Sequence, residues 1–154
     1  MISHSTPLFL STMGLYAVSE AGGGRVGLKE LVGKRVGIVR GYDYNIEFTS
    51  NAAVLKEESL SDLASLRKLL KGRVDYAMVE RRVFAYLVAS NADEFSGRFK
   101  DVAKAIRPGT LRVSFSSKWP EAERMARLLD QGLAAIEASG EYDRINDRWS
   151  FRPH

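Results

Sequence analysis

Strand-like and helix-like segments alternate along the middle of the chain. Arg35–Val39 and Val74–Val79 are short β-branched runs of the kind that form buried strands. Between them, leucines recur at helical spacing and would line one face of a helix; they are Leu60, Leu63, Leu66, Leu69 and Leu70. Because strands that alternate with helices are typical of parallel sheets, the sequence predicts an α/β fold with a mainly parallel sheet.

The remaining elements are predicted from local patterns. Ser59 and Asp62 have the spacing of a helix-start box, and Gly72 is placed to end that helix. Asn91–Arg98 is expected to be a polar loop. The other predicted strands are Leu15–Val18, Ala53–Lys56 and Leu111–Ser116, and the other predicted helices are Tyr44–Ala52, Arg81–Ser90, a helix from Pro120 to Gly140, and Glu141–Trp149.

Composition excludes several classes of function. The chain has 154 residues, of which 45% are hydrophobic, and this suits one soluble domain with its own core. It has no cysteine, and its two histidines, His4 and His154, stand at opposite ends, so we expect no metal site and no cofactor. The longest apolar run, Val83–Ala89, is far shorter than a membrane-spanning helix. The net charge of +4 comes from scattered basic residues, and this pattern does not favour nucleic-acid binding.

The segment Gly22–Gly27 matches the dinucleotide-binding pattern G-x-G-x-x-G. A dinucleotide site needs a long helix directly after this motif. Gly33 would end any such helix after about one turn, which is too short for a parallel crossover. The segment is therefore predicted to be a flexible, hairpin-like connection.

Two turns that follow predicted strands hold the candidate site residues. Gly41 lets the chain turn sharply, and Tyr42 and Tyr44 either wall a ligand site or cover the edge of the core. Asp43 is either the N-cap of the next helix or part of that site. Glu80 directly follows the second strand, where it either binds a substrate ammonium or pairs with a neighbouring arginine. Because ligands of α/β proteins sit beyond the carboxyl ends of strands, these five residues form the predicted ligand-binding site.

Four stretches, in this order, resemble a known family. Ser5–Phe9 with Leu15–Val18 is similar to the segment that leads into the family's first hinge strand. Leu28–Ile38 is similar to its D-L-x-G-K-x-V-G-V stretch, and Leu66–Asp75 to its L-x-x-G-R-x-D stretch. Gly140–Trp149 resembles its closing D-G-T-Y-x-x-I-x-x-K-W. The family is that of the bacterial extracellular solute-binding proteins of the amino-acid type.

This resemblance implies a periplasmic binding protein type II-like fold, in which two α/β lobes close on a ligand. It implies the solute-binding component of an ABC transporter, located in the periplasm, that delivers a small polar ligand such as an amino acid to an ABC permease in the inner membrane. In the family, the loop that corresponds to Gly41–Tyr44 holds the ligand carboxylate, and the acid at the position of Glu80 holds the ligand ammonium. The loop here has no Ser or Thr, and Asp43 would repel a carboxylate.

The resemblance also divides the chain. Residues 1–27 correspond to the crossing strand and connection from the first lobe, 28–106 to the second α/β lobe, and 107–154 to the return strand and C-terminal helices of the first lobe. Nothing here matches the start of the family's first lobe or its export signal, so an N-terminally truncated chain with one complete lobe is expected. The apolar stripe of the C-terminal helices would then lack its sheet, and we expect a homodimer that covers it; the stripe is Met125, Leu129, Leu133 and Ile136.

Two other functions stay open. One is a ligand-sensing regulatory domain on the same fold, which would need an output module outside these residues. The other is a dehydratase for a small carboxylic acid, which would depend on Glu80 and Asp43 as proton carriers. Because the chain has no G-x-S-x-G elbow and only terminal histidines, we expect no catalytic residue and a binding protein rather than an enzyme.

Overall fold

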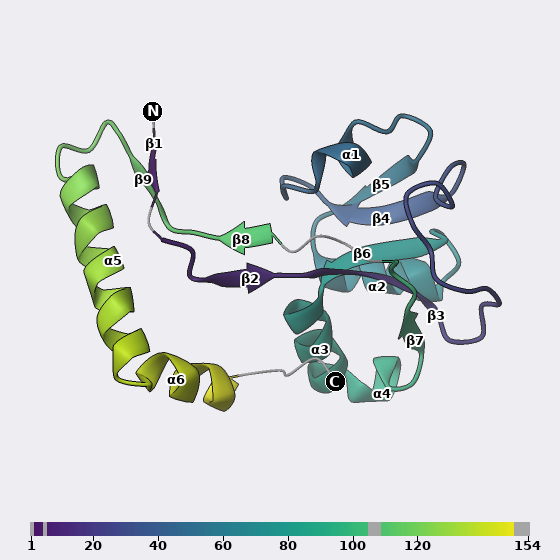
Figure 1. Cartoon of the computed structure of the whole chain (residues 1–154). Coiled ribbons are helices and arrows are strands. Elements are labelled where there is room, and N and C mark those ends of the chain that lie inside the picture. The colour runs from purple at the N-terminus through teal and green to yellow at the C-terminus, as the bar shows by residue number, and fades with distance from the viewer. Residues whose placement is uncertain (1, 5, 105–108, 150–154) are drawn as a thin grey trace. The chain divides into compact units, whose positions relative to one another are not determined.

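The computed structural model describes residues 2–4, 6–104 and 109–149, and the chain forms two compact units. Unit 1 comprises Met1–Ser11 and Pro108–His154, and unit 2 comprises Thr12–Arg107. Figure 1 labels the helices and strands of both. The division into family segments at 1–27, 28–106 and 107–154 stays a prediction, and His154 lies outside the described residues.

Unit 2 is built on a five-stranded sheet with the order β5-β4-β6-β3-β7 (Figure 1). β4 is parallel to both β5 and β6, whereas β3 is antiparallel to β6 and β7. The predicted α/β fold is confirmed, with the parallel strands gathered in one half of a mixed sheet. The strands are β3 (Met13–Val18), β4 (Arg35–Val39), β5 (Leu55–Ser59), β6 (Tyr76–Glu80) and β7 (Phe99–Asp101).

Both faces of this sheet are covered, which explains why its three central strands, β4, β6 and β3, are largely buried. Successive residues of one strand belong to different core clusters: Leu15 lies in one and Tyr16 in the other. The first cluster includes Phe48 of α1 (Ile46–Thr49). The second includes Leu66 and Leu69 of α2 (Asp62–Leu70), and it also contacts α3 (Arg81–Ser90) and α4 (Ala92–Phe95).

Two predicted helix starts are wrong by two residues each, and both errors come from choosing among neighbouring polar residues. Asn45, not Asp43, caps α1, because its side chain accepts a hydrogen bond from the Glu47 N–H at 2.7 Å. Ser61, not Ser59, caps α2, since Ser59 is still the last residue of β5. The predicted helix end at Gly72 is confirmed by its φ of 65° beside the C-cap.

Two predicted connections and one predicted strand also differ from the structure. Gly22–Gly27 is not a hairpin-like connection, because β6 lies between β3 and β4. The predicted loop Asn91–Arg98 contains α4. The predicted strand Leu111–Ser116 is split into two short strands that pair with different partners.

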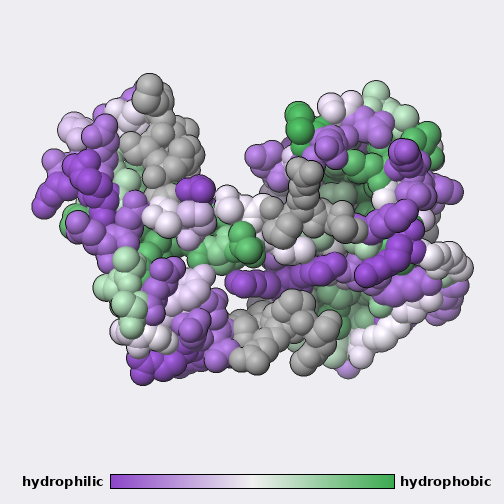
Figure 2. Space-filling view, in the orientation of Figure 1, coloured by the Kyte–Doolittle hydropathy of each residue, from purple (hydrophilic) through white to green (hydrophobic). Residues whose placement is uncertain are grey.

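Unit 1 consists of two strand pairs and two helices. β1 (Ile2–His4) pairs with β9 (Ser114–Ser116), and β2 (Phe9–Ser11) pairs with β8 (Gly109–Leu111), both antiparallel. α5 (Ala122–Ala138) and α6 (Glu141–Trp149) follow, and α5 packs on β1, β9 and α6. On the face shown in Figure 2, α5 presents mostly hydrophilic side chains.

The apolar stripe of α5 is partly covered within this unit. Leu133 is buried, and Met125, Leu129 and Ile136 are half-buried. The backbone N–H and hydroxyl of Thr6 both donate to the Asp130 carboxylate, at 2.5 and 2.7 Å, and so hold the N-terminal segment against α5. Among the described residues, no helix is long and apolar enough to cross a membrane.

Candidate functional site

The candidate site lies at the edge of the unit 2 sheet where β4, β5 and β6 end. Because these strands are parallel, the turns that follow them meet at the same edge. The turn after β4 contains residues 40–45, the turn after β5 contains Leu60 and Ser61, and Glu80 is the last residue of β6. The structure thus brings the turn at Gly41 and the acid Glu80 to one edge.

The turn after β4 contains one buried and one exposed tyrosine. Gly41 has a φ of 82°, a conformation that favours glycine, and this reverses the chain directly after the strand. Tyr44 points into the core, where its hydroxyl accepts a hydrogen bond from the Val39 N–H at 2.8 Å, and burial raises its pKa to about 12. Tyr44 therefore covers the edge of the core, whereas Tyr42 is exposed and accessible to a ligand.

Tyr42 contacts a carboxylate that the sequence did not single out as a site residue. Its hydroxyl donates a hydrogen bond to Oδ2 of Asp62 at 3.2 Å. Asp62 is the first residue of α2 and is only 6% exposed. Burial raises the pKa of Asp62 above its ordinary value. The hydrogen bond from Tyr42 and an interaction with the backbone N–H of Asp62 itself oppose this rise, and the nearby charge of Glu80 adds to it.

Glu80 is held by backbone donors rather than by an arginine. Its Oε2 accepts hydrogen bonds from the N–H groups of Arg82 and Val83, at 2.7 and 3.1 Å, and so caps α3. Its Oε1 accepts one from the Thr12 N–H at 3.3 Å. The arginine next to it, Arg81, pairs with Asp101 at 2.8 Å instead. Glu80 is thereby fixed in place, with hydrogen-bonding capacity left on Oε1.

Asp43 is exposed and does not join this arrangement. It forms no hydrogen bond or ion pair with any residue that the structure describes, and it adds only negative charge to the edge. The basic residue of the same turn, Arg40, is paired with Glu58 at 2.7 Å. Acidic groups therefore predominate at this edge of the sheet.

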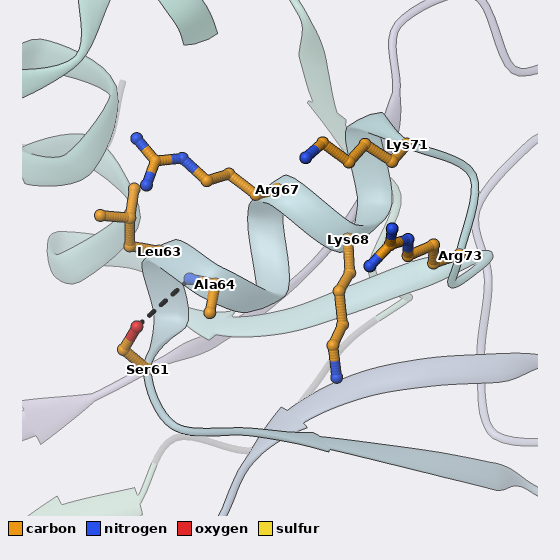
Figure 3. A pocket seen from close by; sticks show the side chains of 7 residues that line it. All are labelled: Ser61, Leu63, Ala64, Arg67, Lys68, Lys71 and Arg73. Atoms are coloured by element: carbon orange, nitrogen blue, oxygen red, sulfur yellow. Dashed lines mark hydrogen bonds between the residues drawn. The ribbon is translucent and has the colours of Figure 1, made fainter.

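A depression of about 300 Å³ runs along α2 from its N-cap to the residues after its last turn (Figure 3). Its residues are Ser61, Leu63, Ala64, Arg67, Lys68, Lys71 and Arg73. Glu94 binds the Arg67 guanidinium through both carboxylate oxygens, and Lys68 donates to the Glu58 carbonyl at 2.7 Å. The side chains of Lys68 and Lys71 point away from each other (Figure 3), so the cations of this groove do not converge on one point.

The described part of the chain offers no metal centre, since it contains no group of three or more His, Asp or Glu side chains placed to hold an ion. The carboxylates of Asp62 and Glu80 and the phenol of Tyr42 lie at the ends of the parallel strands. The arrangement is suited to hydrogen bonding and to neutralising a positive charge.

No protein-family model matches the sequence, and no curated protein matches it either. Solved structures do share its fold. A mutant of ArgBP from T. maritima superposes with a TM-score of 0.79 and 17% identity, over 96% of this chain and 61% of that chain. The GluR0 ligand-binding core from Nostoc punctiforme, in complex with L-glutamate, gives a TM-score of 0.77 and 19% identity, over 99% of this chain and 66% of that chain.

A third solved structure is a histidine kinase sensor domain with similarity to periplasmic binding proteins. It gives a TM-score of 0.78 and 22% identity, over 97% of this chain and 63% of that chain. The chain therefore spans less than two thirds of the length of each of these structures. The resemblance inferred from the sequence motifs is confirmed at the level of the fold: unit 1 and unit 2 together have a periplasmic binding protein type II-like fold.

Proposed function

We propose that this chain binds a small polar ligand, such as an amino acid, at the carboxyl edge of the unit 2 sheet. The observation that carries the proposal is the meeting of Tyr42, Asp62 and Glu80 at the ends of parallel strands. Gly41 and Asp43 belong to the turn that presents Tyr42, and Tyr44 anchors that turn to the core. Glu80 accepts the ligand ammonium through the remaining capacity of Oε1.

The proposal extends to the role of a solute-binding component of an ABC transporter. In that role the chain works in the periplasm and hands its ligand to an ABC permease in the inner membrane. The fold shared with an arginine-binding-type protein and with a glutamate-bound ligand-binding core supports this assignment. A non-enzymatic role belongs to the same proposal, and the fold shared with a glutamate-bound ligand-binding core supports it.

A ligand-sensing regulatory domain is the second candidate function. The likeness to a histidine kinase sensor domain over 97% of this chain favours it specifically. Both functions begin with the same ligand-binding step. They differ in the partner that responds to it: a permease in transport, and an output module in sensing. A permease complex isolated with the chain would favour transport, whereas a covalently linked kinase module would favour sensing.

Calorimetric titration of the chain with each common amino acid tests the binding step. We expect saturable heat with at least one of them, because the backbone hydrogen bonds to Glu80 hold its carboxylate in place before the ligand arrives. The absence of saturable heat with every amino acid at ligand concentrations of about 10 mM would rule out the proposed function.

Glu80→Gln tests the assigned ammonium partner. The variant keeps an oxygen that can cap α3 but loses the charge, so we expect amino-acid affinity to fall at least roughly tenfold. Glu47→Gln is the matched control, because Glu47 is an exposed glutamate in the first turn of α1, and we expect its affinity to stay within about twofold. Circular dichroism checks that Glu80→Gln is folded. If the folded variant binds amino acids as tightly as the wild type, Glu80 is not part of the site.

We also propose that two copies of the chain associate through the C-terminal helices. Leu128 of α5 and Ile145 of α6 are exposed hydrophobic residues, although the stripe of α5 is partly covered within unit 1. Sedimentation equilibrium at micromolar concentrations is expected to give twice the chain mass of 17.1 kDa, and Leu128→Glu is expected to lower it. A 17.1 kDa particle at every concentration would contradict the dimer.

A further inference from the structure

Asp62 is an unusual residue for the first position of a helix, because it is almost completely buried. First-turn acids normally point to solvent, where they interact with the free N–H groups of the helix. Asp62 is only 6% exposed, and its Oδ1 is buried without a hydrogen bond from any residue that the structure describes. A carboxylate oxygen in that state is unfavourable unless something else satisfies it.

The position of Asp62 is fixed by its surroundings. It lies one helical turn before Ser65, which is fully buried against β4 at Gly37. Its other oxygen, Oδ2, accepts the hydrogen bond from Tyr42, a residue that is 53% exposed. The carboxylate is thus held between the sheet and a side chain that reaches the surface of the candidate site.

No cation within the described residues neutralises this carboxylate. The charged group that acts on it is Glu80, which raises its pKa further. Arg40, in the turn after β4, is paired with Glu58 of β5. Asp62 and Glu80 form no ion pair with a described lysine or arginine, whereas Arg81 and Arg67 are paired with other acids. Among the described residues, Asp62 therefore has no positive partner, and its Oδ1 has no hydrogen-bond donor.

The rim of the same edge is apolar. Large hydrophobic side chains stand exposed in the segments that follow β4 and β5: Tyr42 at 53% in the turn after β4, Ile46 at 74% in α1 and Leu60 at 86% in the turn after β5. Hydrophobic surface is visible over α1 in Figure 2. An aliphatic stem with a charged end packs well on a rim of this kind, since the stem covers apolar surface while the end reaches a polar partner.

From these observations we propose that Asp62 determines specificity in the proposed ligand site by receiving an ammonium or guanidinium group at the end of an aliphatic side chain. This inference rests on the proposed function and deepens it. Glu80 takes the α-ammonium, Asp62 takes the side-chain cation together with Tyr42, and the exposed rim carries the stem. The ligand class is a basic amino acid.

Paired ligands test this directly by calorimetry. Citrulline is the neutral counterpart of arginine, and norleucine lacks only the charged end of lysine. We expect the wild-type chain to bind L-arginine or L-lysine at least roughly tenfold more tightly than its neutral counterpart, because a buried carboxylate left unpaired is costly. Equal binding of charged and neutral members of each pair would overturn the inference while the proposed function stands. No binding by any amino acid would overturn both.

Asp62→Asn tests the residue itself. It keeps an oxygen to accept the Tyr42 hydrogen bond but removes the charge, so the preference for the charged ligand is expected to disappear while affinity for the neutral one is retained. Asp93→Asn is the matched control, since Asp93 is an exposed aspartate in the first turn of α4, and we expect it to keep the preference. An unchanged preference in Asp62→Asn would overturn the assignment.

Stability without ligand gives a second readout. Burial raises the pKa of Asp62, so the folded state binds its proton more tightly than the unfolded state does. The stability from this group is fully present below the ordinary aspartate pKa of about 3.9 and is lost as the pH rises through the raised pKa. We therefore expect the unfolding free energy of Asp62→Asn, measured in urea, to increase relative to that of the wild type as the pH rises through this window. A constant difference would mean that the chain already neutralises Asp62, which would also overturn the inference.

Discussion

The close packing of α2 on β4 is the contact on which the candidate site depends. A Cβ atom at Gly37 would lie 2.4 Å from the hydroxyl oxygen of Ser65, and Ser65 is fully buried. Glycine at this position lets the helix approach the strand, and any larger residue would have to displace a hydroxyl that has no room to move. One turn earlier on the same helix face, this approach brings Asp62 down beside the end of β4, within reach of Tyr42.

The parallel pairing of the strands places the other site residues beside the contact between α2 and β4. Because β5, β4 and β6 run in the same direction, the turns after them and the first residues of α2 and α3 meet at one edge. Two residues at this edge also stabilise the fold: the Tyr44 hydroxyl accepts a hydrogen bond from the Val39 N–H, and Glu80 caps α3. Asp62 differs from both, since half of its carboxylate is left without a partner among the described residues. That unpartnered carboxylate oxygen gives the edge its chemical character.

The α/β class, β4 and α3 were predictable from the sequence, because their apolar patterns are continuous and strong. The starts of α1 and α2 were not, since each has two capping residues within three positions and only the folded strand decides which one caps. Short strands such as β7 and β8 carry too few residues for a pattern and depend on their partners. The edge with Tyr42 and Glu80 was predictable from strand order alone. Asp62 was not, because a first-turn acid is normally interpreted as a capping residue, and its burial depends on the close approach at Gly37.

The most direct test of the account is to map where a basic amino acid binds. Two-dimensional ¹H–¹⁵N spectra of the chain, recorded during titration with L-arginine, report the backbone amide of each residue. The account predicts saturable shifts at Tyr42, at Asp62, and at Arg82 and Val83, whose N–H groups bind the Glu80 carboxylate. Shifts confined to the basic groove along α2, at Arg67, Lys71 and Arg73, would contradict it.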